Sequence, residues 1–169
     1  MRAHFQKYSG KGQALPPVPK TDKLVWAWIG ACIAIAATAG LSNWANAPFF
    51  MAPFGASCVL VFAAPNVPLA QPRNLVLGHL VAGFVGLAIF HTLGNDWIYM
   101  GIAVATAITA MQLTRTLHAP AGATPLVVML EQADWSFLVT PILSGALVIL
   151  LVGLVVNNLP KGGHYPEYW

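Results

Sequence analysis

Long apolar runs separated by short polar stretches dominate the chain after residue 23. Four of these runs have the roughly 17 to 25 residues that a helix needs to cross about 30 Å of hydrocarbon. They are residues 24–41, 75–93, 97–113 and 135–159. Two shorter apolar stretches, 49–64 and 119–130, each contain an Ala-Pro pair followed two residues later by glycine. The pattern predicts an all-α membrane protein with four long transmembrane helices and two broken half-helix segments.

The two broken stretches match each other when the chain is shifted by 67 residues. Ala-Pro-x-Gly-Ala-Ser at 52–57 falls on Ala-Pro-x-Gly-Ala-Thr at 119–124, and 11 of the 38 positions from 52 to 89 are identical. A repeat at a fixed offset indicates duplication of a structural unit. We therefore divide the chain into a basic tail (1–23), two membrane repeats (24–93 and 94–159) and a C-terminal tail (160–169).

The placement of charges indicates how the repeats cross the membrane. Five of the eight basic residues precede the first apolar run, which favours a cytoplasmic N-terminus. If each repeat crosses three times, Arg73, Arg115 and Lys161 also lie on the cytoplasmic side. Re-entrant broken segments would instead place the two arginines outside or within the membrane. The charges thus favour a 3+3 inverted repeat with both termini cytoplasmic. We expect the protein to lie in a bacterial inner membrane.

Composition excludes several classes of protein. The chain is 57% hydrophobic and 8% charged, against roughly 25% charged in soluble domains. Its net charge of +3 reflects the basic tail, so we expect no nucleic-acid partner. No carboxylate pair, nucleophile set, phosphate loop or metal-ligand spacing is present, so we expect neither an enzyme nor a cofactor or metal site.

The breaks themselves are the best candidates for a binding site. The apolar run after Pro53 is long enough, at 1.5 Å per residue, for only about half a bilayer, so each break lies near the midplane. Extended backbone would enter and a half-helix would leave, and backbone N–H groups at its start suit an anion. The candidate substrate-binding residues in the two breaks are Pro53, Gly55, Ala56, Ser57, Pro120, Gly122, Ala123 and Thr124.

Four basic side chains lie near these breaks. Arg73 and Arg115 could supply positive potential to the substrate, or could be anchors that reach the interface. His118 is a further substrate-binding candidate, and His118 and His79 are candidates for proton coupling. The alternative is that a histidine in a membrane helix merely bridges neighbouring helices.

Small residues recur in the two longest matching helices. Gly78 and Gly86 fall on Gly145 and Gly153 under the 67-residue shift. Small residues at such spacing let helices approach closely. We interpret them as packing positions, either within the fold or in a homo-oligomer.

The sequence also resembles a known family. "APFGASCVLVFAAPNVPLAQPRN" followed by "LTRTLHAPAGATPLVVML" is similar to the HPP family of small integral membrane proteins, over roughly residues 24–159. The family signature is His-Pro-Pro, whereas this chain reads His118-Ala119-Pro120. The family is described as having four membrane helices, and plastid and cyanobacterial members are associated with nitrite transport. The resemblance therefore implies transport of a small anion.

Three functional hypotheses remain open at this point. The first is a transporter or channel for a small anion, nitrite in particular, with its site between the two breaks. The second is a permeation protein for a neutral or weakly acidic solute. The third is a membrane scaffold that transports nothing, for which a dry, filled interior at both breaks would be the supporting observation.

Overall fold

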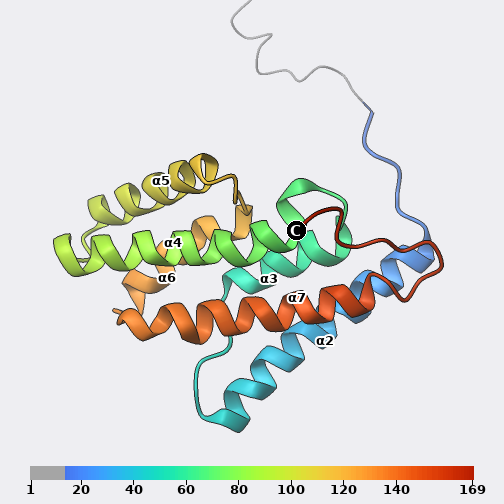
Figure 1. The fold of residues 1–169 in the computed structure, drawn as a ribbon, viewed down its shortest axis with the longest axis horizontal. Coiled ribbons are helices and arrows are strands. Elements are labelled where there is room, and N and C mark those ends of the chain that lie inside the picture. The colour runs from blue at the N-terminus through green and yellow to red at the C-terminus, as the bar shows by residue number, and fades with distance from the viewer. Residues whose placement is uncertain (1–13) are drawn as a thin grey trace, which may run out of the picture.

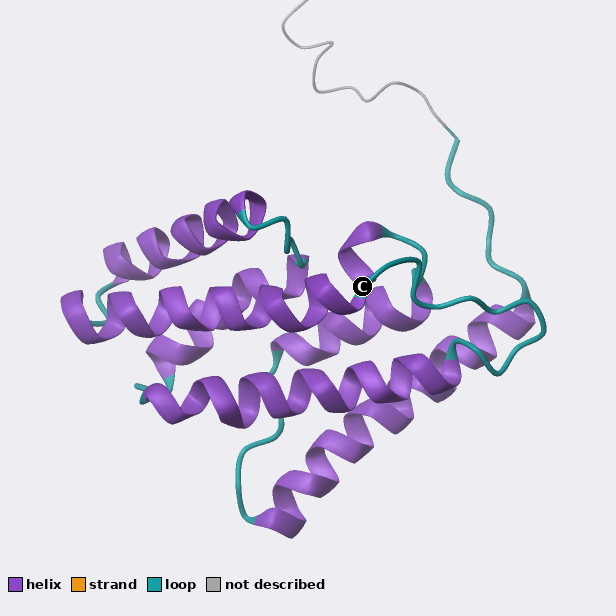
Figure 2. Cartoon of the chain, in the orientation of Figure 1, coloured by secondary structure: helices purple, strands orange, loops and turns teal. Residues whose placement is uncertain are grey.

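The computed structural model describes residues 14–169, which form a bundle of helices joined by short loops (Figures 1 and 2). Three long helices and one of intermediate length make up most of it. The elements are α2 (Thr21–Ala45), α3 (Pro53–Cys58), η2 (Val59–Ala63), η3 (Pro68–Ala70), α4 (Pro72–Leu93), α5 (Trp97–Leu113), η4 (Ala119–Ala123), α6 (Thr124–Leu130), η5 (Trp135–Leu138), η6 (Val139–Leu143) and α7 (Ser144–Val156).

Three helices, not the four predicted, are long and apolar enough to cross a membrane. They are Thr21–Ala45, Pro72–Leu93 and the continuous run Trp135–Val156. The prediction of a fourth span was wrong: α5 has the predicted bounds, Trp97–Leu113, but its 17 residues place it among the shorter apolar helices. The last span is not one regular helix either. It combines η5, η6 and α7, and Thr140 inside it has extended backbone angles (φ −129°, ψ 119°).

In each broken segment a stretch of non-helical backbone precedes a short helix; His118 is extended, as predicted, whereas Asn46 and Arg115 have left-handed angles. Residues 46–52 lead into the helical run Pro53–Ala63, and residues 114–118 lead into Ala119–Leu130. Pro53 and Pro120 occupy the first turns of these runs, where proline needs no backbone N–H partner. Both short helices therefore begin in the middle of the bundle and run toward opposite ends (Figure 1).

Helices that match under the 67-residue shift run in opposite directions. In Figure 1, α2 and α4 run from right to left, whereas their counterparts α5 and α7 run from left to right. The long helices also pack across the two repeats. The last helix of each repeat contacts the first helix of the other: α4 packs against α5, and α7 packs against α2. Neither repeat therefore forms a bundle by itself.

Four matched glycines make reciprocal contacts between the repeats. A Cβ atom on Gly78 would lie 2.7 Å from the Thr116 carbonyl oxygen, and one on Gly145 would meet the carbonyl of Phe49, the residue that matches Thr116. A second matched pair lies eight residues, or about two turns, further along: Gly86 faces Val128, and Gly153 faces Val61. Only glycine lets the helices approach this closely.

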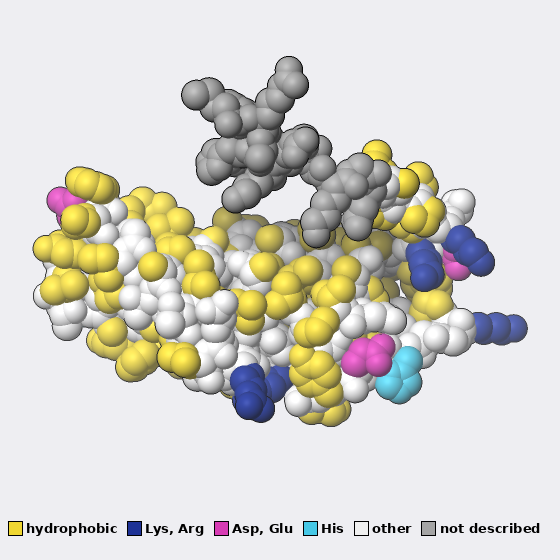
Figure 3. All heavy atoms as spheres, turned by 90° about the horizontal axis from the view of Figure 1, so that it is seen from above, with side chains coloured by type: hydrophobic (Ala, Val, Ile, Leu, Met, Phe, Trp, Pro, Cys, Tyr) yellow, Lys and Arg dark blue, Asp and Glu magenta, His cyan; other side chains and the backbone are white. Residues whose placement is uncertain are grey.

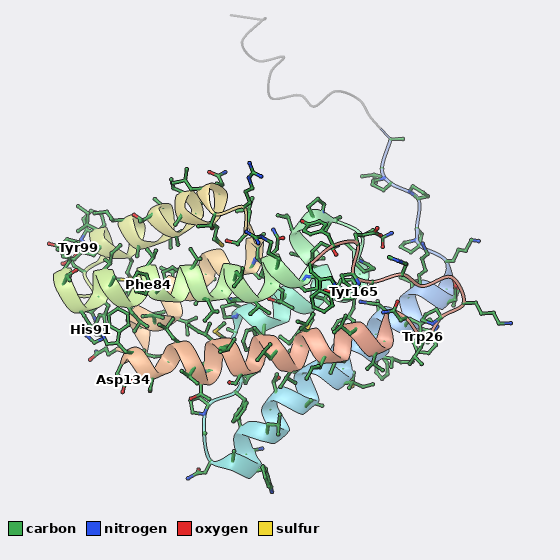
Figure 4. All side chains as sticks on the ribbon, viewed as in Figure 1. Trp26, Phe84, His91, Tyr99, Asp134 and Tyr165 are labelled. Carbon is green, nitrogen blue, oxygen red and sulfur yellow. The ribbon has the colours of Figure 1, made fainter. Side chains whose placement is uncertain are left out.

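The surface suits a lipid environment. In Figure 3, hydrophobic side chains are spread over the visible face, while charged side chains lie at its two ends and along one edge. Figure 4 places Tyr99 and Trp26 at opposite ends of the bundle. Side chains such as Ile33, Val59, Leu151 and Val155 point outward, with exposed fractions from 46% to 64%. A water-soluble protein would not expose so many large apolar groups.

The C-terminal tail packs back onto the turn before α4. The Tyr165 hydroxyl donates to the Ala70 carbonyl (2.8 Å), and the Glu167 N–H donates to Oε1 of Gln71 (2.8 Å). The Asn158 side chain holds the tail in place through the backbone of Tyr165. Residues 160–169, which the sequence left without a role, thus support the turn that carries Leu69 and Ala70.

Candidate functional site

Four polar side chains meet in the centre of the bundle. Ser57 on α3, His79 on α4, His118 before η4 and Thr124 at the start of α6 each have no exposed surface. They come from four separate stretches of sequence, and the two breaks supply all of them except His79. Polar groups inside a membrane are costly unless they are hydrogen-bonded.

These side chains form one continuous hydrogen-bonded chain. The Ser57 Oγ lies 2.9 Å from the Nε2 atoms of both His79 and His118. The Nδ1 of His79 lies 2.9 Å from the Thr124 Oγ1, and the Nδ1 of His118 lies 2.7 Å from the Leu69 carbonyl oxygen. In residues 14–169, every buried side-chain nitrogen and oxygen atom has a hydrogen-bond partner.

The sequence around each break explains why the four groups converge. Ser57 is one turn into α3, and its hydroxyl also lies 3.3 Å from the Pro53 carbonyl. His79 is held by the ring of Phe54, edge-on at 5.2 Å between centroids. The His118 Cβ occupies the space beside Gly78, where any larger residue would collide with it. The glycine therefore allows the two imidazoles to approach to 5.0 Å between centroids.

The two arginines lie outside this centre. Arg73 and Arg115 are both exposed, and Arg73 donates from Nη2 to the Thr114 carbonyl (3.2 Å). This contact brings the start of α4 to the end of α5, close to where the second broken segment begins. Arg115 has a positive φ of 57° in the turn that follows α5. Both side chains can influence the approach to the centre, but neither contacts it.

The small residues of the two motifs face away from the buried centre. Gly55, Ala56 and Ala123 are exposed, Gly122 is half-buried, and a Cβ atom on either glycine would meet nothing within 4 Å. Neither glycine has the positive φ that only glycine adopts easily. The motif candidates thus comprise two buried hydroxyls, two buried prolines (Pro53 and Pro120) and a set of small residues that are exposed or half-buried.

The backbone N–H groups predicted to be free at the half-helix starts have partners. The N–H of Phe54 donates to the Met51 carbonyl, and that of Gly55 donates to the Ala52 carbonyl. At the second break, the N–H of Ala121 donates to the His118 carbonyl. Because proline sits in the first turn and a tight turn precedes it, the orphan donors typical of a helix start are already satisfied.

An apolar groove of about 670 Å³ lies between the two broken segments. Most of its lining consists of residues that match under the 67-residue shift, such as Pro53 with Pro120 and Ala56 with Ala123. The groove is open and hydrophobic, and Ser57, His79, His118 and Thr124 are not part of its lining. It marks where the two repeats meet at the surface, while the polar centre is sealed beneath.

Two backbone carbonyls and one aromatic ring in the central site were not predicted from the sequence. The Leu69 carbonyl ends the hydrogen-bonded chain, the Pro53 carbonyl faces the Ser57 hydroxyl, and Phe54 packs on His79. A carbonyl carries no signature in the sequence. Phe54 breaks the repeat, since alanine occupies the matching position 121, and this asymmetry was the only signal available.

Comparison with known proteins agrees with this architecture. The family model described as "HPP, transmembrane region" matches residues 16–166. Two transmembrane proteins of Dictyostelium discoideum are 38% and 36% identical over 98% of this chain. The alignments cover 63% and 57% of those relatives, so the chain spans about three fifths of their length. No solved structure matches the chain. With long apolar helices and a family match over almost its whole length, the chain belongs to the HPP family of integral membrane proteins.

Proposed function

We propose that the chain is built as two inverted three-crossing repeats around a shared centre. The sequence repeat, the opposite directions of matched helices and the reciprocal glycine contacts support this arrangement. A two-fold relation requires that if one residue contacts a second, their counterparts also touch. The pairs Gly78–Thr116 and Gly145–Phe49 meet this requirement. Inverted repeats with broken helices are a common plan for transporters.

In this proposal the protein carries a small anion across the membrane, with the substrate site at the central polar network. One observation carries the idea: His79 is hydrogen-bonded through its two nitrogens to Ser57 and Thr124, the matching hydroxyls of the two breaks. A ring that links both repeats at the centre is well placed to sense movement of one against the other. Ionisable residues at such depth mark functional pathways.

The charge of the centre bears on the kind of substrate. Its four side chains include no fixed charge, while Arg73 and Arg115 lie exposed on the side that we assign to the cytoplasm. An anion reaching the centre would need a counter-charge, and a protonated histidine is the one that these residues can supply. This favours an anion moving together with a proton, which is equivalent in charge to moving the weak acid. The family resemblance makes nitrite the first substrate to test.

A scaffold function is the second candidate, and one observation favours it. Both breaks have filled interiors, and all four central side chains are fully buried and hydrogen-bonded. A scaffold has no need to open. An occluded state of a transporter has the same appearance, however, because such proteins expose their site to one side at a time.

Flux into sealed proteoliposomes tests the proposal. Nitrite uptake would be followed at several imposed potentials and pH values, with chloride, nitrate and formate as competitors. Saturable uptake above empty vesicles supports transport. Uptake of the anion alone carries charge and should change with the imposed potential. Uptake of the anion together with one proton carries no net charge and should not.

The matched variants are Thr124→Val and His91→Gln. Thr124 belongs to the network, whereas His91 is exposed near the end of α4 and stacks on Trp135. We expect uptake to fall in the first variant and to persist in the second. Absence of uptake from folded wild-type protein would reject transport of these anions and favour the scaffold.

A further inference from the structure

The Leu69 carbonyl fixes the positions of the protons in the central network. A carbonyl oxygen only accepts hydrogen bonds, so the Nδ1 of His118, 2.7 Å away, must carry a hydrogen and donate it. If His118 is neutral, its Nε2 then has no hydrogen and accepts. The partner of that Nε2 is the Ser57 hydroxyl at 2.9 Å, which must donate.

The same reasoning gives the direction of the remaining hydrogen bonds, from Ser57 to Thr124. The Ser57 hydroxyl has one hydrogen, and His118 receives it, so the contact with the Nε2 of His79 must be a donation from His79. Neutral His79 therefore accepts at Nδ1, and the Thr124 hydroxyl donates to it. The two rings hold opposite tautomers, with hydrogen on Nδ1 in His118 and on Nε2 in His79. All four bonds point in one direction, toward Leu69.

A second arrangement satisfies every atom with one more proton. The Ser57 oxygen can accept two hydrogen bonds, and its hydrogen can turn toward the Pro53 carbonyl at 3.3 Å. The Nε2 of His118 is then free to carry a hydrogen and donate it to the Ser57 oxygen. His79 and Thr124 keep the bonds that they had.

We propose that His118 is a proton-binding site in the membrane interior, with the Ser57 hydroxyl as its switch. An arriving proton forms an N–H bond at the Nε2 of His118, and the Ser57 hydrogen moves from that nitrogen to the Pro53 carbonyl. No O–H bond breaks, and only the direction of one hydrogen bond changes. Because the acceptors are already in place, the charged ring is held by hydrogen bonds on both of its nitrogens.

The surroundings limit the network to one proton. The centroids of the His79 and His118 rings are 5.0 Å apart, so two positive rings would repel strongly away from water. η3, η4, α6 and α7 contribute no charged side chain. The titratable and charged groups on the other packed segments are His79, Arg73 and His91 on α4, Cys58 on α3, Tyr99 at the far end of α5, Arg115 before His118, and Lys161, His164, Tyr165, Glu167 and Tyr168 on the tail. The one carboxylate side chain among them, Glu167, is exposed, and the two nitrogens of His118 bond to Ser57 and Leu69. His118 therefore holds its proton without a carboxylate bonded to its ring.

This inference rests on the proposed function, because the proton on His118 is the counter-charge that the anion requires. It also makes a claim that does not depend on transport. Ser57, and not either ring, decides whether the extra proton is accommodated.

Nitrogen-15 NMR of histidine-labelled full chain in lipid bilayers reads the tautomers directly. At neutral pH we expect His118 with hydrogen on Nδ1 and His79 with hydrogen on Nε2. As the pH falls, His118 should become doubly protonated while His79 stays neutral. Assignment would use His118→Gln and His79→Gln, each of which removes one set of signals.

The variants Ser57→Ala and Ser57→Thr test the switch. Alanine removes the acceptor, so doubly protonated His118 at a fixed acidic pH should fall about tenfold, the factor expected for one charge-assisted hydrogen bond. Threonine keeps a hydroxyl, as at the matching position 124, so Ser57→Thr should retain the wild-type fraction of doubly protonated His118. If both variants behave as wild type, or if the two rings hold the same tautomer, the inference is wrong.

Combining the NMR with nitrite uptake separates the two proposals. The expected tautomers without any uptake would support the proton site and reject the transport function. Uptake in a protein whose His118 never gains a second proton would support transport and reject the proton site. His91→Gln, outside the network, should leave both measurements unchanged.

Discussion

The hydroxyl oxygens of Ser57 and Thr124, which match in the internal repeat, each lie 2.9 Å from a different nitrogen of the same imidazole. The ring is that of His79, whose own counterpart in the repeat is Ala146. Two equivalent groups therefore meet at a residue that has no equivalent. The other ring of the network, His118, falls on Met51 under the same shift, so neither imidazole has a counterpart in the repeat.

Loss of the Thr124 hydroxyl should destabilise the fold. Thr124→Val keeps the side-chain shape but leaves the Nδ1 of His79 without a donor in a fully buried position. Such a change costs about 1–3 kcal/mol. Thr124→Ser keeps the hydroxyl and should cost less. Thermal unfolding in detergent, followed by circular dichroism, measures the difference, and equal melting temperatures for the two variants would contradict the hydrogen bond.

The reciprocal glycine contacts predict matched effects of matched mutations. Gly78→Ala and Gly145→Ala each place a methyl group against a carbonyl of the other repeat. Overpacking of this kind costs typically about 1–3 kcal/mol. Since the two carbonyl contacts match, both variants should lose stability, and the Phe54 ring beside Gly145 and the His118 Cβ beside Gly78 add to the cost at each site.

Gly101→Ala is the control for this comparison. Gly101 lies inside α5, and a Cβ atom there would meet nothing within 4 Å. Alanine should therefore be neutral or slightly stabilising, because it favours the helix by about 1 kcal/mol over glycine. A stabilising effect at Gly78 or Gly145, measured in the same unfolding assay, would show that the helices are further apart.

The arginines should affect the rate of anion uptake and not the stability of the fold. Arg115→Ala and Arg73→Ala remove exposed positive charges that do not contact the centre. Uptake should fall most at low ionic strength, where charges act over a distance of about 30 Å at 0.01 M salt. The effect should shrink at 1 M salt, where that distance is about 3 Å. A loss that does not depend on salt would instead indicate direct contact with the substrate.

Asp134 provides a pH-dependent contribution to stability outside the membrane. Its carboxylate accepts hydrogen bonds from the Ser136 side chain and N–H (2.8 Å for the N–H), and these lower the pKa of Asp134 below 3.8. A carboxyl whose pKa is lower in the folded state stabilises the fold above the unfolded pKa of about 3.9. That stabilisation disappears as the pH falls through the folded pKa.

Asp134→Asn should therefore lower the melting temperature at pH 7, with a difference from wild type that shrinks toward pH 2. Glu131→Gln, which changes an exposed carboxylate in the same loop, is the control. Melting curves of all three proteins across this pH range check the prediction. A difference that persists unchanged at pH 2 would mean that the carboxylate charge is not responsible.

The sequence was most informative about the helix breaks, because proline and glycine act on the backbone at their own positions. Proline and glycine at 52–56 and 119–123 predicted where the helices break, and the half-helix Pro53–Ala63 has the expected length. The bounds of α5 were predicted correctly at 97–113, but its 17 residues make it shorter than the three helices that can span a membrane. The 67-residue match indicated equivalence between repeats, but it carried no information about which helix packs against which.

The candidate site was predicted in composition and not in geometry. Ser57, Thr124, His79 and His118 were all named, yet nothing in the sequence showed that they touch each other while Arg73 and Arg115 stay outside. Distances between side chains depend on how closely the helices approach. The glycine contacts at Gly78 and Gly145 decide this, and they become visible only when both repeats are folded together.

The C-terminal tail gives the centre of the protein a mechanical link to its surface. Tyr165 and Glu167 hold the turn at Ala70 and Gln71, and the adjacent Leu69 carbonyl fixes the orientation of His118. A fluorescent protein, affinity tag or surface tether attached directly after Trp169 would pull on that turn. Labels for single-molecule or purification work therefore belong at the other end of the chain, before Thr21, away from the turn that holds His118.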